Sequence, residues 1–124
     1  MERRMAIRLN ESASEQARRL IEDGRFVVDQ RDDWSEHQPS SKQENEFIRE
    51  HGIAAYARWH LGVDDSKGED TKARYKFPYG DFNRVHRCAL LAAESRAGQY
   101  KYFDIERAVA HLHGMVDAGS RPTG

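Results

Sequence analysis

The chain has 124 residues, a third of them charged, and a formal net charge of −1; no apolar run approaches the roughly 20 residues that a membrane-spanning helix needs. This length is typical of one domain, so we expect residues 1–124 to form a single domain with loose ends at 1–11 and 118–124. The N-terminal MERRMAIRLN has no apolar stretch after it and the lone Cys88 can form no internal disulfide, which argues against a secreted protein and predicts a cytoplasmic one without membrane association.

Two helices are predicted in the first half. The first, at 13–23, begins after Ser12, which stands at a capping-box spacing from Glu15, and ends at Gly24. RFVVD then reads as a short strand, and RDDWSEHQPSS as an ordered loop, because its acids, proline and serines supply no periodic apolar face. A second helix follows at 42–51, with a serine cap before it and Gly52 after it.

A β-hairpin is predicted in the middle of the chain, with strands at about 57–63 and 72–77. The first strand alternates apolar Trp59, Leu61 and Val63 with smaller or polar residues. Pro78 cannot donate a ladder hydrogen bond, so the second strand stops there. Period-two alternation predicts that the rings of Tyr75 and Phe77 point into the protein together, while Arg74 and Lys76 point into water.

Two further helices are predicted at 82–99 and from Asp104 onward. Both carry apolar residues at helical spacing, and both are rich in alanine, so they can approach closely as an antiparallel pair. The predicted fold class is therefore α+β: a helix-rich domain of about four helices, with one β-hairpin packed on the C-terminal helix pair.

The stretch from residue 59 to 112 resembles a small module found in tailed-phage head-morphogenesis and prohead-protease-type proteins and in short bacterial proteins with FPYGDF-like centres. The family's role is unassigned, and this chain has no recognisable protease portion, so the resemblance implies a shared domain and no activity. The matching residues are Trp59, Leu61, Val63, Asp64, Thr71, Lys72, Tyr75, Lys76, Pro78, Asp104, Ile105, Ala108, His111 and Leu112.

The leading functional hypothesis is a small non-enzymatic module that binds a protein partner or a second copy of itself. Residues 22–50 hold nine acidic against four basic residues, whereas 67–107 hold nine basic against six acidic, and such opposed charges favour association. Trp34 stands in a charged loop that suits either docking or plugging the edge of the core. The candidate binding residues are Trp34, Arg74, Lys76, Tyr79, Arg84 and Arg87.

A second hypothesis is nucleic-acid association through the basic residues between 67 and 107. It is less favoured, because base stacking and phosphate contact would use opposite faces of the predicted strand.

A third hypothesis is a metal-dependent or hydrolytic enzyme. Residues two apart on a helix point about 200° apart, so neither His86 with Cys88 nor His111 with His113 can hold one ion there. If a metal site exists, we expect His86 and His111 to meet across the helix interface. Cys88 lies on the apolar face and is expected to be a buried structural residue, and no catalytic residue or cofactor is assigned.

Overall fold

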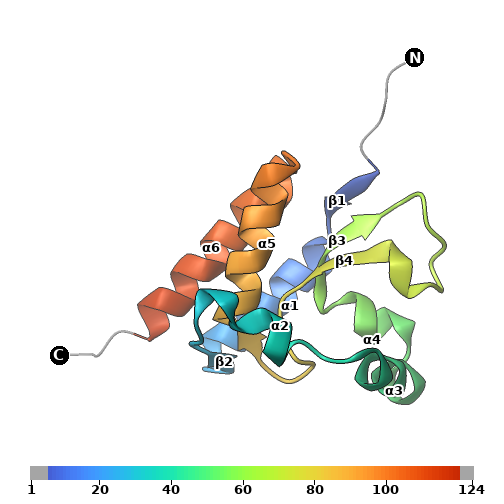
Figure 1. Cartoon of the computed structure of the whole chain (residues 1–124), viewed down its shortest axis with the longest axis horizontal. Coiled ribbons are helices and arrows are strands. Elements are labelled where there is room, and N and C mark those ends of the chain that lie inside the picture. The colour runs from blue at the N-terminus through green and yellow to red at the C-terminus, as the bar shows by residue number, and fades with distance from the viewer. Residues whose placement is uncertain (1–5, 121–124) are drawn as a thin grey trace.

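The computed structural model describes residues 6–120, which form six α-helices, two 3₁₀ turns and five strands (Figure 1). In chain order the elements are β1 (Ile7–Leu9), α1 (Glu11–Glu22), β2 (Phe26–Val27), η1 (Arg31–Asp33), α2 (Trp34–His37), α3 (Ser41–His51), α4 (Ile53–Ala57), β3 (His60–Asp64), η2 (Lys72–Arg74), β4 (Tyr75–Pro78), β5 (Val85–His86), α5 (Arg87–Gln99) and α6 (Phe103–Gly119).

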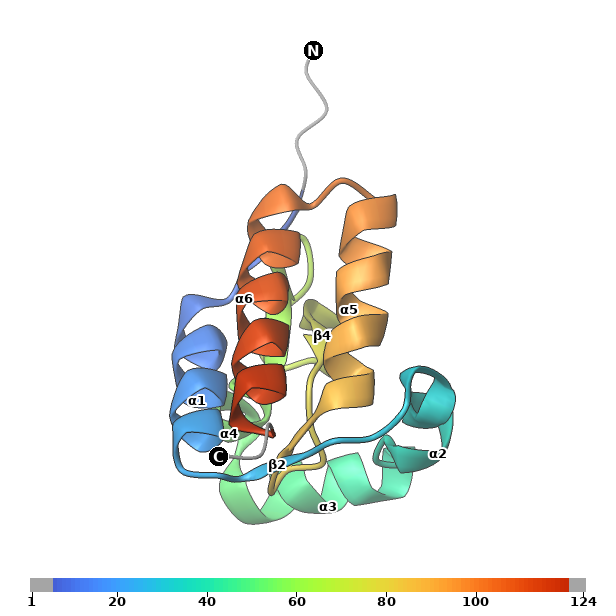
Figure 2. The same cartoon turned by 90° about the vertical axis from the view of Figure 1, so that its left-hand side faces the viewer.

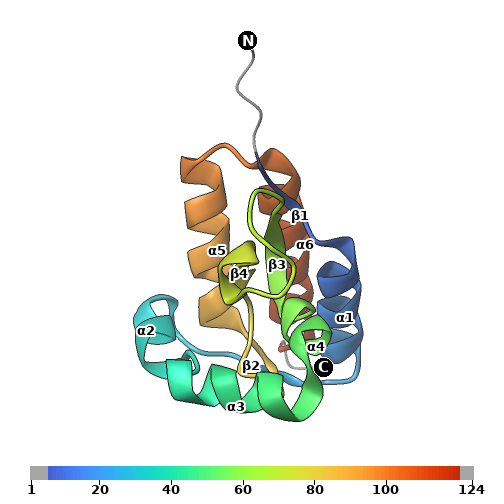
Figure 3. The same cartoon turned by 90° about the vertical axis from the view of Figure 1, so that its right-hand side faces the viewer.

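A layer of three helices covers one side of a small antiparallel sheet. The sheet has the strand order β1-β3-β4, and β4 is an edge strand. Helices α1, α5 and α6 pack beside it, with α5 and α6 as neighbours (Figures 1 and 3). Strands β2 and β5 form a separate parallel pair of two residues each, which ties the segment after α1 to the segment before α5.

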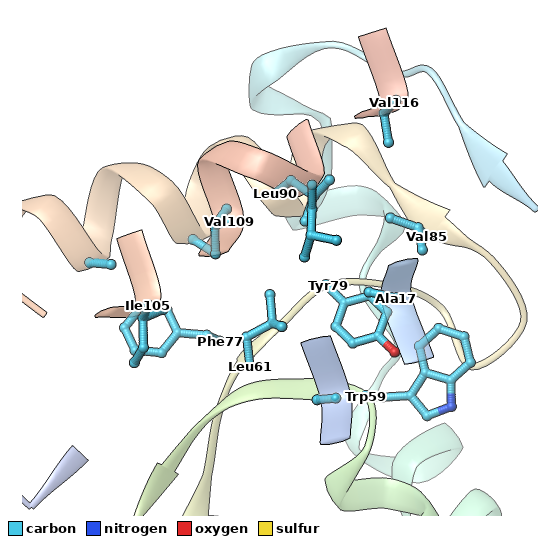
Figure 4. Close-up of a cluster of buried hydrophobic side chains, with 14 of the residues drawn as sticks. Ala17, Trp59, Leu61, Phe77, Tyr79, Val85, Leu90, Ile105, Val109 and Val116 are labelled. Carbon is cyan, nitrogen blue, oxygen red and sulfur yellow. The ribbon is translucent and has the colours of Figure 1, made fainter. Parts of the chain in front are cut away.

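The core lies between the helices and the sheet, where apolar side chains from all of them meet (Figure 4). The ring of Phe77 lies so close to the Gly62 backbone that a Cβ there would come within 2.7 Å of it, which requires glycine at this position. Tyr79 is fully buried, and its hydroxyl donates to the Arg58 carbonyl at 2.8 Å. The other large fully buried residues are Leu61, Val85, Cys88, Leu90, Ile105, Val109, Leu112 and Val116.

The predicted fold class, including the hairpin and the C-terminal helix pair, is confirmed. The predicted ends of the early helices are close to those observed. Ser40 caps α3 and accepts a hydrogen bond from the Gln43 backbone, and Gly24 and Gly52 follow α1 and α3 with φ of 77° and 90°. These positive φ values suit glycine and explain why the two helices stop there.

Several predicted boundaries are wrong. Residues 53–57 form α4, so the first hairpin strand begins at His60, and the second begins only at Tyr75, after the η2 turn. Helix α1 begins at Glu11 rather than at Ala13, because the Asn10 side chain is fixed by hydrogen bonds to the carbonyls of Ala57 and His60.

The predicted loose ends are wrong where the structure describes them. Residues 7–9 are a strand of the sheet, because they pair with β3. Residues 118 and 119 continue α6. The rest of the predicted loose ends, 1–5 and 121–124, lies outside the described residues.

The helix predicted at 82–99 begins five residues later, at Arg87. Val85 and His86 pair with β2 as a parallel strand, and Asp81 accepts the backbone N–H groups of Asn83 and Arg84 in a turn before it. His86 is therefore extended while Cys88 is helical. The argument that these two side chains diverge around one helix does not apply.

The predicted common inward orientation of Tyr75 and Phe77 is also wrong. Phe77 has a φ of 61°, which is rare for a bulky residue and breaks the period-two alternation. Its ring packs edge-on to Tyr102, whereas the ring of Tyr75 lies near Tyr56 and His60. Phe77 is buried and Tyr75 is half-buried, so only one of the two rings fills the core.

Within residues 6–120, no helix has both the length and the apolar composition that crossing a bilayer requires.

His60 provides a test of the packing between α4 and the sheet. It is buried, its Nδ1 donates to the Tyr56 carbonyl at 2.8 Å, and burial lowers its pKa to about 4. In the unfolded chain His60 binds a proton below about pH 6.5, whereas in the folded chain it stays neutral down to about pH 4. The free energy of unfolding therefore falls as the pH decreases from about 6.5 toward 4. His60→Asn keeps a donor without this titration. Between about pH 7 and pH 5, urea unfolding should show the wild type losing about 2 kcal/mol more than this variant. Equal losses would contradict the burial of a neutral imidazole.

Candidate functional site

The carboxylate of Asp29 accepts hydrogen bonds from three residues, His37 nearby in the sequence and His86 and Cys88 more than fifty positions away. Asp29 follows β2, and its side chain is buried. Its Oδ1 accepts the backbone N–H of Cys88 at 2.7 Å, and its Oδ2 lies 2.7 Å from Nδ1 of His86, 2.8 Å from Nδ1 of His37 and 3.0 Å from Sγ of Cys88. We call these four residues, Asp29, His37, His86 and Cys88, the Asp29 cluster.

His86 lies between two carboxylates. Its Nε2 is 2.8 Å from Oδ2 of Asp81, on the side opposite Asp29. The other oxygen of Asp81 accepts the two backbone N–H groups of the turn before β5, so Asp81 is itself fixed. Each ring nitrogen of His86 therefore contacts a carboxylate, and these two contacts fix the orientation of the imidazole.

The cluster reaches the surface at α2, through His37. His37 is the last residue of this short helix, and its side chain is 37% exposed. Trp34, at the start of the helix, is half-buried and places its ring 5.8 Å from the ring of His86. Helix α2 lies beside the N-terminal end of α5 (Figure 2).

The electrostatics of the cluster favour an ionised Asp29 and a protonated Cys88. Burial alone would raise the pKa of Asp29, but the hydrogen bonds from Cys88, His86 and His37 outweigh it and hold the pKa well below its usual range. Burial and the adjacent carboxylate raise the pKa of the Cys88 thiol far above its usual value. The hydrogen bond to Asp29 raises the pKa of His37.

This geometry does not make Cys88 a nucleophile. An activated cysteine needs an exposed thiol and a base that takes its proton. Here Sγ is fully buried and donates to a carboxylate, while Nδ1 of His37, 4.0 Å away, is engaged with the same carboxylate. What the cluster does offer is four ligand atoms within 4.8 Å of one another, from residue types that bind metal ions.

A groove of about 580 Å³ lies between the edge strand β4 and helix α5, and Trp34 is among the residues that line it. On the α5 side the groove is lined by three alanines and Arg96, and on the opposite side by strand β4. We call it the β4–α5 groove. Its lining residues are Ile7, Trp34, Gln38, Tyr75, Lys76, Phe77, Pro78, Ala89, Ala92, Ala93, Arg96, Tyr100 and Tyr102.

Two cations line this groove, Lys76 and Arg96, and neither forms an ion pair with an acidic side chain among residues 6–120. The pKa of Asp64 is lowered mainly by hydrogen bonds from Ser66, and the charge of Lys76 also helps to lower it. Three other basic side chains between residues 67 and 107, those of Lys72, Arg74 and Arg87, form ion pairs within the chain. Lys72 contacts Glu44 at 3.0 Å, and Arg87 contacts Asp117 at 2.7 Å. The unpaired positive charge near the groove is therefore available to a ligand.

The structure brings together only two of the six predicted binding residues, Trp34 and Lys76, both in the groove. Arg74 and Arg87 are ion-paired, and Arg84 is exposed on the turn before β5. Tyr79 is fully buried in the core, so it has no surface for a partner.

The predicted pairing of His86 with His111 is replaced by the Asp29 cluster. His111 is exposed on α6 and is not a member of any group of potential metal ligands found in residues 6–120. The prediction failed because α5 was expected to include His86, which would have turned its side chain toward α6.

Sequence reasoning missed the roles of Asp29, His37 and Asp81 in this site. Asp29 and His37 were assigned to a short strand and a loop, and no spacing connects them with residues 86 and 88. The one available signal was the H-x-C pair at 86–88, whose side chains converge if His86 is extended and the helix starts after it.

Comparison with protein-family models, curated proteins and solved structures gives no match to this chain. The resemblance to a phage and bacterial module stays a prediction.

Asp29→Asn tests the role of the carboxylate in stability. An amide has one acceptor oxygen and no charge, so the donors of His86, His37 and Cys88 lose partners in a buried place. We expect the variant to unfold with a free energy about 2–4 kcal/mol lower than that of the wild type. Asp32→Asn, an exposed neighbour in η1, is the matched control and should stay within about 0.5 kcal/mol. Similar small losses in both variants would show that the cluster does not stabilise the fold.

Proposed function

We propose that the protein is an interaction module that binds an extended, acidic segment of a partner protein in the β4–α5 groove. The observation that carries the proposal is the coincidence of three features in one place: a free strand edge, a groove of about 580 Å³ and two unpaired cations.

The strand edge supplies the backbone contacts. Among the described strands β4 pairs with β3 alone, so its outer edge carries peptide groups that an added strand can bond. β4 has four residues, and a strand rises about 3.3 Å per residue, so a segment of about four residues matches its length. Addition of a peptide strand to a sheet edge is a common recognition mode, in which the main chain gives affinity and side-chain pockets give specificity.

The lining supplies the specificity. Ala89, Ala92 and Ala93 leave room on the α5 side for the side chains of the bound segment. Trp34, Tyr100 and Tyr102 offer aromatic surfaces, and aromatic residues are enriched at interface centres. Lys76 and Arg96 favour carboxylates in the ligand, because neither forms an ion pair with an acidic side chain among residues 6–120.

Two other ligands are less well supported. Nucleic acid would use the basic residues between 67 and 107, but Lys72, Arg74 and Arg87 contact acids of the same chain, and Tyr79 is buried. A second copy would need its own β4 in the groove, and strand β4 itself carries Lys76, which places like charges together.

A random-peptide display selection on the untagged protein tests the proposal. We expect enriched peptides to combine acidic and apolar residues, and their binding, measured by fluorescence anisotropy, to weaken at least about tenfold in the double variant Lys76→Glu/Arg96→Glu. Backbone amide signals of β4 and α5 should shift on binding. Arg107→Glu, which changes the charge of an exposed residue of α6 away from the groove, is the control and should bind like the wild type.

Equal weakening by the control and the groove variant would contradict the proposal, as would peptides without acidic residues. Two parallel measurements separate the other ligands. Salt-dependent binding of labelled oligonucleotides would indicate phosphate contacts, and a concentration-dependent dimer in light scattering would identify a second copy as the occupant.

A further inference from the structure

The Asp29 cluster gathers the side-chain types that coordinate zinc: two imidazoles, a thiol and a carboxylate. We propose that this cluster binds a single Zn²⁺ ion through one atom of each of its four residues. The site is separate from the β4–α5 groove and does not depend on what the groove binds.

The ligand atoms converge from three elements. Nδ1 of His37 comes from α2, Nδ1 of His86 from β5, and Sγ of Cys88 from the first turn of α5. All three face the same oxygen of Asp29, Oδ2, at 2.7 to 3.0 Å. A carboxylate oxygen surrounded by three donors is an arrangement in which a cation can replace the hydrogen atoms between them.

The dimensions fit zinc after a small expansion. Zinc binds oxygen or nitrogen at about 2.0–2.2 Å and sulfur at about 2.3 Å, so atoms around a tetrahedral ion lie about 3.3–3.8 Å apart. The distance between Sγ of Cys88 and Nδ1 of His37 is 4.0 Å, slightly wider than this, and the other separations among the four ligand atoms are at most 4.8 Å. The distances from Oδ2 of Asp29 to the other three ligand atoms are shorter than those around a tetrahedral ion, because these pairs are hydrogen-bonded in the metal-free protein. His37 ends a four-residue surface helix, so it can move outward by the half ångström required.

The outer partners of the ligands are those expected of a metal site. The second oxygen of Asp29 is occupied by the Cys88 N–H, which leaves only Oδ2 for the ion. With its proton on Nε2, His86 donates to Asp81 and presents Nδ1 as a neutral ligand. A carboxylate behind a metal-binding histidine fixes its tautomer and orientation in many zinc proteins.

The surrounding charge also favours a cation. Asp33 and Glu36 act on His37, and Asp81 lies behind His86, so three carboxylates surround the cluster besides Asp29 itself. On binding, the Cys88 thiol releases its proton to solvent, and the thiolate forms the bond to zinc. Nδ1 of His37 and of His86 must also be free of a proton, so each imidazole binds as the neutral tautomer with its remaining proton on Nε2. With four protein ligands the coordination sphere is complete, which is the pattern of a structural site rather than a catalytic one. The ion would fasten α2 to the start of α5.

Metal titration of the untagged protein, freed of metal by a chelator, tests the proposal. Cobalt(II) serves as the spectroscopic probe, because a thiolate ligand gives a charge-transfer band and a tetrahedral site gives intense visible bands. We expect one cobalt per chain with both signals, and full displacement by one equivalent of Zn²⁺. The exposed position of His37 allows His37→Ala without loss of the fold. Because even the loss of an outer partner of a ligand weakens metal binding about 10–100-fold, this variant, which loses a ligand, should bind Zn²⁺ at least about 100-fold more weakly. Cys88→Ser should lose the charge-transfer band.

His111→Ala is the matched control, since it removes an exposed histidine from α6, and it should bind like the wild type. Circular dichroism of each variant confirms folding before titration. Three results would overturn the proposal: no binding tighter than tens of micromolar, equal weakening in His37→Ala and His111→Ala, or a cobalt complex without the thiolate band.

Discussion

The fold depends on one carboxylate placed at the beginning of a helix. The first N–H groups of any helix lack partners within it, and His86, which precedes α5, provides no cap with its own side chain. Asp29 takes that role from 59 positions away, by accepting the Cys88 N–H. Its negative charge also complements the positive end of the helix dipole. A buried carboxylate is unfavourable unless its oxygens accept hydrogen bonds, so Asp29 also fixes the positions of His37 and His86, which contact its second oxygen.

This constraint determines the shape of the surface beside it. Once the start of α5 is fixed, the alanines of that helix face the edge of the sheet, and α2 lies across the end with Trp34 against His86. A larger residue at Ala89 or Ala93 would fill the space between β4 and α5. The groove is thus a consequence of where the helix begins and of how small its side chains are, and the cluster and the groove meet at one tryptophan.

Local patterns in the sequence predicted the elements whose signals are local. The Ser40 cap, the glycines after α1 and α3, and the apolar period of α6 each identify an element from residues a few positions apart. The start of α5 escaped prediction, because helix propensity alone runs on from Phe82, while a parallel pairing with Phe26 and Val27 makes residues 85 and 86 a strand. The Asp29 cluster escaped for the same reason: Asp29 and His37 meet His86 and Cys88 only through that long-range pairing.

The exchange rate of the Cys88 backbone amide tests the central role of Asp29 most directly. An amide in the first turn of a helix normally exchanges fast, because no backbone carbonyl accepts it. Here the acceptor is the Asp29 side chain at 2.7 Å in a buried place. Native-state hydrogen exchange by NMR should therefore find this amide among the slowest of the chain, opening only with global unfolding. Exchange at the rate of an exposed first-turn amide would show that Asp29 does not hold the helix, and would contradict the account.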